Sequence, residues 1–145
     1  MRKMLFLVAI VLLASNMMAE TIAATDSRVT FVGRAEVEDG SLRFDWPATY
    51  FRVAFTGRSL AMRVSDNKRN YYAVWVDMPT SAEPTRIVEV KGNDTIIDLV
   101  LAADVKKSKV KEHQVVIQKR TEAGCGTTTV HAFMTDGRFV QAAPM

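Results

Sequence analysis

Apolar and polar residues alternate along most of the chain beyond residue 25, and this alternation is the feature that most limits the possible folds. Between Thr49 and Gly57, for example, Phe51, Val53 and Phe55 fall on one side of an extended chain. A period of two residues is the pattern of a β-strand with one buried face. Clusters of Gly, Asp, Asn and Pro separate the alternating segments and are typical of turns. The pattern therefore predicts an all-β protein.

The alternation predicts nine strands, at residues 28–35, 41–46, 49–57, 59–66, 70–77, 86–90, 95–101, 112–120 and 127–134. No helix is expected between them, and Thr56-Gly57-Arg58 suits a tight hairpin. A chain of this length encloses one ordinary hydrophobic core. Short strands in one domain favour a β-sandwich or jelly roll, placed at residues 26–136. Residues 137–145 lose the alternation and are expected to form a C-terminal tail or a truncated linker.

The N-terminus has the pattern of a secretory signal peptide. Two basic residues precede an apolar run at residues 4–13, which is too short to span a membrane. Cleavage is expected after Ala19, or as late as Ala23, so that residues 1–19 are the signal peptide. The sequence therefore predicts an exported protein, periplasmic or extracellular, with no membrane attachment after the signal is removed.

Charge and cysteine content exclude several classes of function. Without residues 1–19 the chain keeps 17 basic and 16 acidic side chains, which is not the positive surface of a nucleic-acid binder. The basic run at residues 106–111 is expected to be a solvated loop. A single cysteine, Cys125, excludes a disulfide within the chain, and His113 and His131 alone make no zinc-type cluster. No cofactor and no metal are expected.

One predicted strand, Asn-Tyr-Tyr-Ala-Val-Trp-Val-Asp at residues 70–77, carries large apolar groups on both faces. Tyr72 lies on one face, and Tyr71 and Trp75 lie on the other. A strand with one wetted face would not have this pattern. Either a loop covers the second aromatic face, or that face meets a sugar ring or another domain.

The sequence contains no recognisable catalytic arrangement. No serine lies in a Gly-x-Ser-x-Gly or Gly-Asp-Ser context that would expose it on a sharp turn. His131 alternates with its neighbours on a strand, where a structural histidine with satisfied hydrogen bonds is expected. Asp66, Asn67 and Asn70 have oxygens that suit calcium, but their spacing matches no calcium loop, so a turn is expected there. We therefore expect no catalysis by this chain alone.

Several segments together resemble the N-terminal domain of carbohydrate esterase family 2. They are VTFVGRA (29–35), GSLRFDWPATYFRVAFTGRSLAMRVSDNKRNYYAVWVD (40–77), KGNDTIIDLVLAA (91–103), EHQVVIQKRTEA (112–123) and TTTVHAF (127–133). This family contains acetylxylan esterases and related polysaccharide deacetylases, in which a jelly-roll domain precedes an SGNH-type hydrolase domain. The resemblance implies a jelly roll here. It carries over no catalytic residue, because the chain has no Gly-Asp-Ser block, and the loop at Cys125 departs from the family pattern.

The resemblance implies a non-catalytic accessory domain that supports a hydrolase domain or contacts a glycan. The alternative is an autonomous secreted carbohydrate-binding module, and a self-sufficient esterase is disfavoured. The expected partners are a hydrolase domain or chain and a plant-type polysaccharide. The candidate residues for contact with a glycan or a second domain are four aromatic and five polar side chains: Trp46, Tyr50, Tyr71, Trp75, Arg63, Asp66, Asn70, Arg120 and Glu122.

Overall fold

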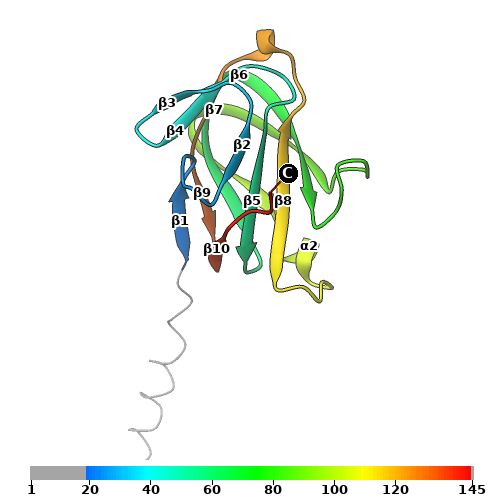
Figure 1. Cartoon of the computed structure of the whole chain (residues 1–145). Helices are drawn as coiled ribbons and strands as arrows, with labels where there is room; N and C mark the ends of the chain where they lie inside the picture. The colour runs from blue at the N-terminus through cyan, green and yellow to red at the C-terminus, as the bar shows by residue number, and fades with distance from the viewer. Residues whose placement is uncertain (1–18, 145) are drawn as a thin grey trace, which may run out of the picture.

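The computed structural model describes residues 19–144, which form a β-sandwich of jelly-roll type with ten strands (Figure 1). The strands are β1 (Glu20–Ala23), β2 (Thr30–Val32), β3 (Glu36–Glu38), β4 (Ser41–Phe44), β5 (Tyr50–Thr56), β6 (Leu60–Val76), β7 (Arg86–Val100), β8 (Glu112–Lys119), β9 (Thr128–Thr135) and β10 (Arg138–Val140). A short helix, α2 (Ala102–Val105), and a 3₁₀ turn, η1 (Ala123–Cys125), complete the fold. The all-β sandwich predicted from the alternation is confirmed, and the predicted signal peptide lies outside the described residues except for Ala19. None of the described helices is long and apolar enough to cross a membrane.

The strands form two layers that share their longest members, and all pairings are antiparallel. In the first layer β2 and β10 lie end to end along one edge of β5. β8 pairs with the other edge of β5, and the second half of β6 pairs with β8. In the second layer β3 pairs with β4. β4 and β1 both pair with β9, one after the other, and β9 also pairs with the first half of β6. β7 follows β6 along nearly its whole length. β6 and β7 therefore bend and belong to both layers.

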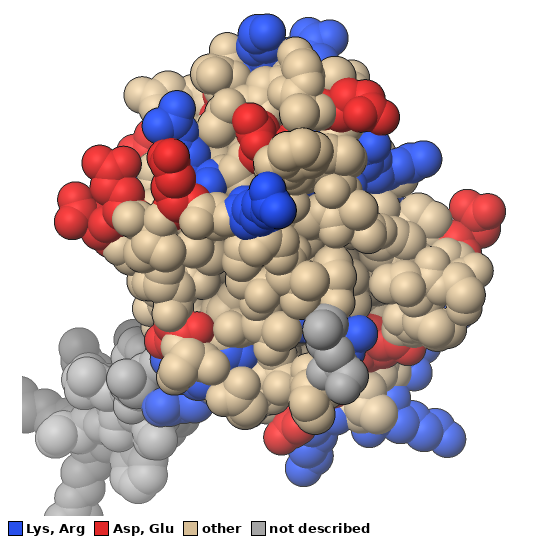
Figure 2. All heavy atoms as spheres, turned by 45° about the horizontal axis from the view of Figure 1, so that its top comes forward, with Lys and Arg blue, Asp and Glu red and all other residues tan. Residues whose placement is uncertain are grey.

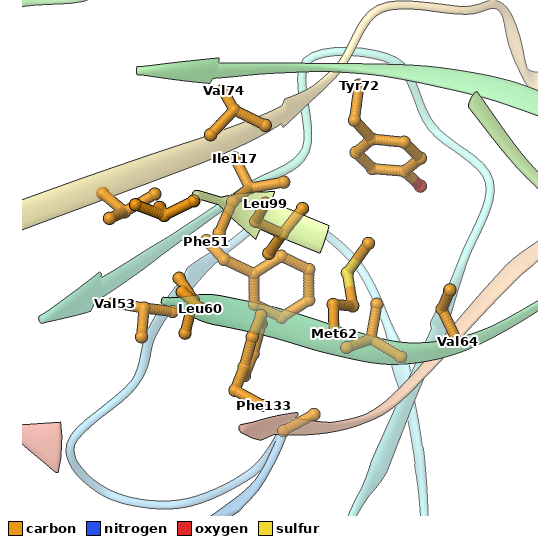
Figure 3. Close-up of a cluster of buried hydrophobic side chains, with 14 of the residues drawn as sticks. Phe51, Val53, Leu60, Met62, Val64, Tyr72, Val74, Leu99, Ile117 and Phe133 are labelled. Atoms are coloured by element: carbon orange, nitrogen blue, oxygen red, sulfur yellow. The ribbon is translucent and has the colours of Figure 1, made fainter. Parts of the chain in front are cut away.

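The inward faces of the two layers meet in one core centred on Phe51. The Phe51 ring centroid lies 4.9 Å from that of Phe31, 5.7 Å from that of Phe44 and 5.4 Å from that of Phe133. Figure 3 shows Phe51 against Phe133 in the middle of the cluster. Tilted and edge-on ring contacts of this kind add to the free energy of burial. The core thus fixes β2, β4, β5 and β9 relative to one another.

Two predicted turns lie inside long strands. Separate strands were expected at residues 59–66 and 70–77, but the structure joins them in the single strand β6. It likewise joins the strands expected at residues 86–90 and 95–101 in β7. The polar residues in the middle of β6 remain paired with β7, with register shifts between Val64 and Asp66 and between Asp66 and Arg69. These shifts are β-bulges, which bend a strand without ending it. Gly, Asn and Asp therefore mark a bend here and not a hairpin.

The predicted hairpin at residues 56–58 is also wrong. β5 pairs with β2, β8 and β10 but not with β6, so this connection carries the chain from one layer to the other. The two backbone N–H groups that follow Gly57 donate to Asp136 Oδ1 at 2.8 and 3.0 Å, and this bond lowers the pKa of Asp136 although burial opposes it. A side chain on Gly57 would meet that carboxylate, and one on Gly137 would overlap the carbonyl oxygen of Thr56. Two glycines thus let the β5–β6 and β9–β10 connections touch.

Both ends of the described chain add strands that the alternation did not reveal. β10 lies within residues 137–145, which were expected to be a tail, and its Phe139 is buried. β1 pairs with β9, and the Glu20 carboxylate accepts hydrogen bonds from the Phe139 backbone N–H at 2.7 Å and from Arg28 at 2.8 Å, which lower its pKa. Strands of three or four residues are too short for a period-two pattern to be recognised. Cleavage after Ala23 would remove β1, whereas cleavage after Ala19 leaves it whole.

Candidate functional site

Trp46 is the most exposed aromatic ring among the candidate residues. It lies in the β4–β5 loop, which crosses the top of the sandwich in Figure 1, and 55% of the residue is exposed. The loop is held in place by β8, because Ala48 donates its backbone N–H to the Lys119 carbonyl at 3.1 Å and Lys119 donates to the Thr49 carbonyl at 2.9 Å. Ala48 has a φ of +63°, a conformation that costs a non-glycine residue free energy. A fixed and locally strained loop therefore presents this ring to solvent.

Trp46 separates two hollows in the surface. The first has a volume of about 400 Å³ and a mainly apolar lining made by Trp46 with Val32, Gly33, Arg34, Pro47, Ala48 and Thr49. The second has a volume of about 340 Å³ and a mainly polar lining made by Trp46 with Arg34, Ala35, Glu36, Arg43, Phe44, Asp45 and Thr127. Figure 2 shows basic and acidic side chains interspersed over this end of the molecule. Trp46 therefore borders two spaces of different polarity.

A third hollow continues the polar one. It has a volume of about 310 Å³ and shares Arg43 and Thr127 with the second hollow. Its remaining lining residues come from the bulged part of β6, from β7 and from β9: Ser65, Asp66, Asn67, Asn93 and Thr129. We call the three connected hollows the Trp46 groove. The third hollow of the groove lies where β6 and β7 bend.

The groove combines the features that sugar recognition needs. An exposed indole offers a flat apolar face, and flanking polar side chains can exchange hydrogen bonds with hydroxyl groups. Arg34 borders both hollows beside Trp46 and makes no hydrogen bond or ion pair with the other described residues. Arg43 is paired only loosely, at 3.6 Å from Glu36, and both side chains are exposed. These groups remain accessible to a ligand.

The other three aromatic candidates lie outside the groove. Trp75 is buried, and its Nε1 donates to the Ala82 carbonyl at 2.9 Å, so the β6–β7 loop covers it. Tyr71 is half-buried and donates its hydroxyl to Glu89 at 3.1 Å. Tyr50 is half-buried on the outer face of β5. Of the two alternatives for residues 70–77, a covering loop is therefore correct for Trp75.

Two polar candidates, Asp66 and Asn70, lie in a buried network and not on a free surface. The Asn70 amide donates to Asp66 at 2.7 Å and to the Gly126 carbonyl at 3.2 Å, and its oxygen accepts from Thr121. Thr128 donates to the same Asp66 carboxylate at 2.7 Å. The network ties β6 to the η1 segment. These two residues are structural, and only the edge of Asp66 reaches the third hollow.

The three remaining candidates are exposed and none of them lines the groove. Arg63 forms an exposed ion pair with Asp94, which raises the arginine pKa and lowers that of the aspartate. Exposed pairs of this kind contribute little to stability. Arg120 and Glu122 flank the buried network on the η1 side. The structure therefore brings one of the nine candidates, Trp46, fully into the groove.

A buried lysine that is not among the nine candidate residues holds the η1 segment. Lys119 is 1% exposed, and its Nζ donates to the carbonyls of Thr121 at 2.7 Å and Glu122 at 3.2 Å. Burial lowers its pKa, because the charged form loses solvation. The alternation does indicate this burial, because Lys119 falls on the same inward face of β8 as Val115 and Ile117.

His131 of β9 is held between two serines of the neighbouring strands β4 and β6. Both ring nitrogens of His131 lie near hydroxyls, Nδ1 at 3.0 Å from Ser41 and Nε2 at 2.9 Å from Ser65. Ser65 donates to Asn93 and accepts from the Asp94 backbone N–H, so its hydroxyl is fully used. The prediction of a satisfied structural histidine is confirmed. Within residues 19–144 no group of His, Cys, Asp or Glu is placed to hold a metal ion.

Comparisons with known proteins agree with this fold. Among solved structures, a family two carbohydrate esterase from Cellvibrio japonicus has a TM-score of 0.73 and 24% identity, over 88% of this chain and 36% of its own. A family two esterase from Clostridium thermocellum, in complex with cellohexaose, has a TM-score of 0.67 and 20% identity, over 80% and 34%. The CBM36-1 domain of a xylanase from the hindgut metagenome of Trinervitermes trinervoides has a TM-score of 0.56 and 8% identity, over 88% and 100%.

The chain spans about a third of the length of these two esterases, and it matches the CBM36-1 domain as a whole. No curated protein matches it. A family profile described as the carbohydrate esterase 2 N-terminal domain matches residues 31–144, which include β2 to β10. The chain therefore belongs to the family of carbohydrate esterase 2 N-terminal domains.

Proposed function

We propose that this chain is an exported, non-catalytic accessory domain of a family two carbohydrate esterase, and that it contacts a polysaccharide through the Trp46 groove. The observation that carries the proposal is Trp46 itself, more than half exposed on a fixed loop between an apolar and a polar hollow. An exposed ring that borders an apolar hollow and a polar one offers both the apolar contact and the hydrogen-bonding groups that a sugar needs.

The comparisons support a role in glycan contact. One solved relative is an esterase in complex with cellohexaose, and the CBM36-1 domain shares this fold as a separate unit of a xylanase. Both are parts of larger carbohydrate-active enzymes. An open groove of three connected hollows suits an internal stretch of polysaccharide better than a single sugar.

Replacement of Trp46 by alanine should weaken polysaccharide binding by at least about tenfold, because truncating an anchoring tryptophan at a contact surface costs on the order of 2 kcal/mol. Affinity electrophoresis and calorimetry with soluble xylan, glucomannan and mixed-linkage glucan would measure the change. Trp46→Phe keeps a ring and should retain part of the affinity. The matched control is Ile96→Ala, which removes an equally exposed apolar side chain from β7 outside the groove. Unaltered binding by Trp46→Ala, or no binding of any glycan by the unmodified protein, would refute the proposal.

A second role, docking of a hydrolase domain, is favoured by the outer face of β5 and β8. A hollow of about 320 Å³ lies there between the loop at Met78 and the segment at Ala143. Within it the Nε of Arg52 is buried without a hydrogen-bond partner, although its Nη1 donates to the Pro144 carbonyl at 3.4 Å. Arg52 as a whole is half-buried, so the exposed part of its guanidinium can pair with a carboxylate or carbonyl of a second domain.

Arg52→Glu should therefore reduce binding of a separately produced family two hydrolase domain by at least about tenfold in a pull-down or calorimetric titration. Arg69→Glu, which makes the same charge change on an exposed part of β6, is the control. Equal binding by both variants and by the unmodified protein would remove this face as the docking site.

A further inference from the structure

The third hollow of the Trp46 groove presents hydrogen-bond donors that have no partner in the described chain. The Asn67 Oδ1 accepts a hydrogen bond from the Thr127 backbone N–H at 2.8 Å, which fixes the orientation of the amide and leaves its Nδ2 free. The Asn93 Oδ1 accepts from Ser65 at 3.1 Å, and its Nδ2 likewise has no partner. Arg43 adds a guanidinium whose one ion pair is long and exposed. Three residues with such donor groups therefore line one space.

The carboxylate oxygens in and beside this hollow already have hydrogen-bond or ion-pair partners within the protein. Asp66 lines it, but its carboxylate accepts from the Lys68 backbone N–H at 2.9 Å, from Asn70 and from Thr128. Asp94, which follows Asn93, is paired with Arg63. The hydroxyls of Thr127 and Thr129 can both donate and accept. The hollow is thus rich in unpaired donors and has no unpaired carboxylate.

Local backbone geometry explains why these donors come together. The two β-bulges of β6 turn Asn67 towards the second layer, and Gly92 and Asp94 adopt positive φ values of +86° and +52° where β7 bends. Bulges of this kind are frequent beside binding sites, because they redirect side chains from a regular sheet. The residues concerned are distant in sequence, and the bends place them in one lining.

We propose that the third hollow binds the carboxylate of an acidic sugar, so that the Trp46 groove recognises polysaccharides that carry uronic-acid units. The inference rests on the proposed function, because the hollow joins the groove through Arg43 and Thr127. A guanidinium and two amide N–H groups suit a carboxylate, which only accepts hydrogen bonds. The sugar ring on Trp46 supplies the apolar contact, and the hollow selects the charged substituent.

The test compares xylotetraose with the same oligosaccharide carrying one glucuronic acid, by calorimetry at low salt. The unmodified protein should bind the acidic form about tenfold more tightly, and the preference should shrink as salt is raised. Asn67→Asp keeps the oxygen that accepts from Thr127 and replaces the free donor by a negative oxygen. This variant should lose the preference but bind xylotetraose as before. Gln141→Glu, with the same charge change outside the groove, should leave both affinities unchanged.

The outcomes separate the inference from the proposed function. Equal affinity for the two oligosaccharides, or a preference that survives Asn67→Asp, overturns the uronate subsite and leaves glycan binding intact. Absence of binding to either oligosaccharide and to the polysaccharides above overturns both. Free glucuronate and inorganic phosphate serve as competitors: if inorganic phosphate displaces the acidic oligosaccharide as well as free glucuronate does, the hollow is a general anion site and the inference fails. Thermal unfolding of Asn67→Asp verifies that the fold is retained.

Discussion

Replacement of Asn70 by leucine should lower the free energy of unfolding by about 3–5 kcal/mol. Asn70 is fully buried and connects Asp66, Thr121 and the Gly126 carbonyl by hydrogen bonds. Leucine is similar in size but offers no hydrogen bond, so three buried polar groups would lose a partner at once. The loss is largest at Asp66, because a buried carboxylate depends on its donors.

Denaturant unfolding followed by fluorescence measures this loss, and the neighbouring residue supplies the control. Arg69→Ala changes an exposed side chain whose ion pair with Glu89 is 3.9 Å long, and it should alter stability by no more than about 0.5 kcal/mol. A loss below about 1 kcal/mol for Asn70→Leu would mean that the network does not stabilise the fold. Asp66 and Asn70 would then again be candidates for ligand contact.

The second large effect is expected at Gly137, where alanine should destabilise the protein by at least about 3 kcal/mol. A Cβ at this position would overlap the carbonyl oxygen of Thr56 and approach Gly57. The backbone cannot move away cheaply, because β10 is paired with β5 directly after this glycine. The cost therefore comes from close approach of two backbones and not from an unusual dihedral angle.

Gly124→Ala is the matched control, because a Cβ there meets nothing within 4 Å. It should be neutral or slightly stabilising, since alanine reduces the conformational freedom of the unfolded chain. Thermal and denaturant unfolding of the two variants side by side would show the contrast. Equal stabilities for Gly137→Ala and Gly124→Ala would show that the β5–β6 and β9–β10 connections do not touch in solution.

The sequence predicted which way side chains point better than it predicted which strands pair. Phe51, Val53, Phe55, Leu60 and Met62 are all buried, as the alternation indicated. Alternation is a local property, because successive side chains of any strand point to opposite faces. Pairing depends on distant segments.

The turn residues do mark places where the chain changes direction, but the predicted connections at these places were wrong. Gly57 was expected to close a hairpin but changes layer, and the Asp66–Asn70 stretch bends a strand instead of ending one. A glycine or asparagine permits several backbone conformations, and the rest of the fold selects among them.

The candidate site was predictable only where exposure follows from local sequence. Trp46 was proposed as a contact residue at the end of the predicted strand 41–46; it lies in the β4–β5 loop before a proline, and it is exposed as a contact residue must be. Trp75 has the same chemistry, but a loop that follows it in sequence covers it, and no property of residues 70–77 reveals that cover. Asn67 and Asn93 are separated by much of β6 and β7, so their shared hollow follows from bulges that no short motif encodes.

The two bent strands have a consequence for the domain as a whole. Because β6 pairs with β8 in one layer and with β9 in the other, and β7 follows it through the bend, separation of either layer breaks pairs of the same strand. The sandwich is then one cooperative unit, with its slowest amide exchange in the middle strand β6. Since the third hollow sits on the bend itself, a glycan held there opposes unfolding of the entire domain and not only of a surface loop.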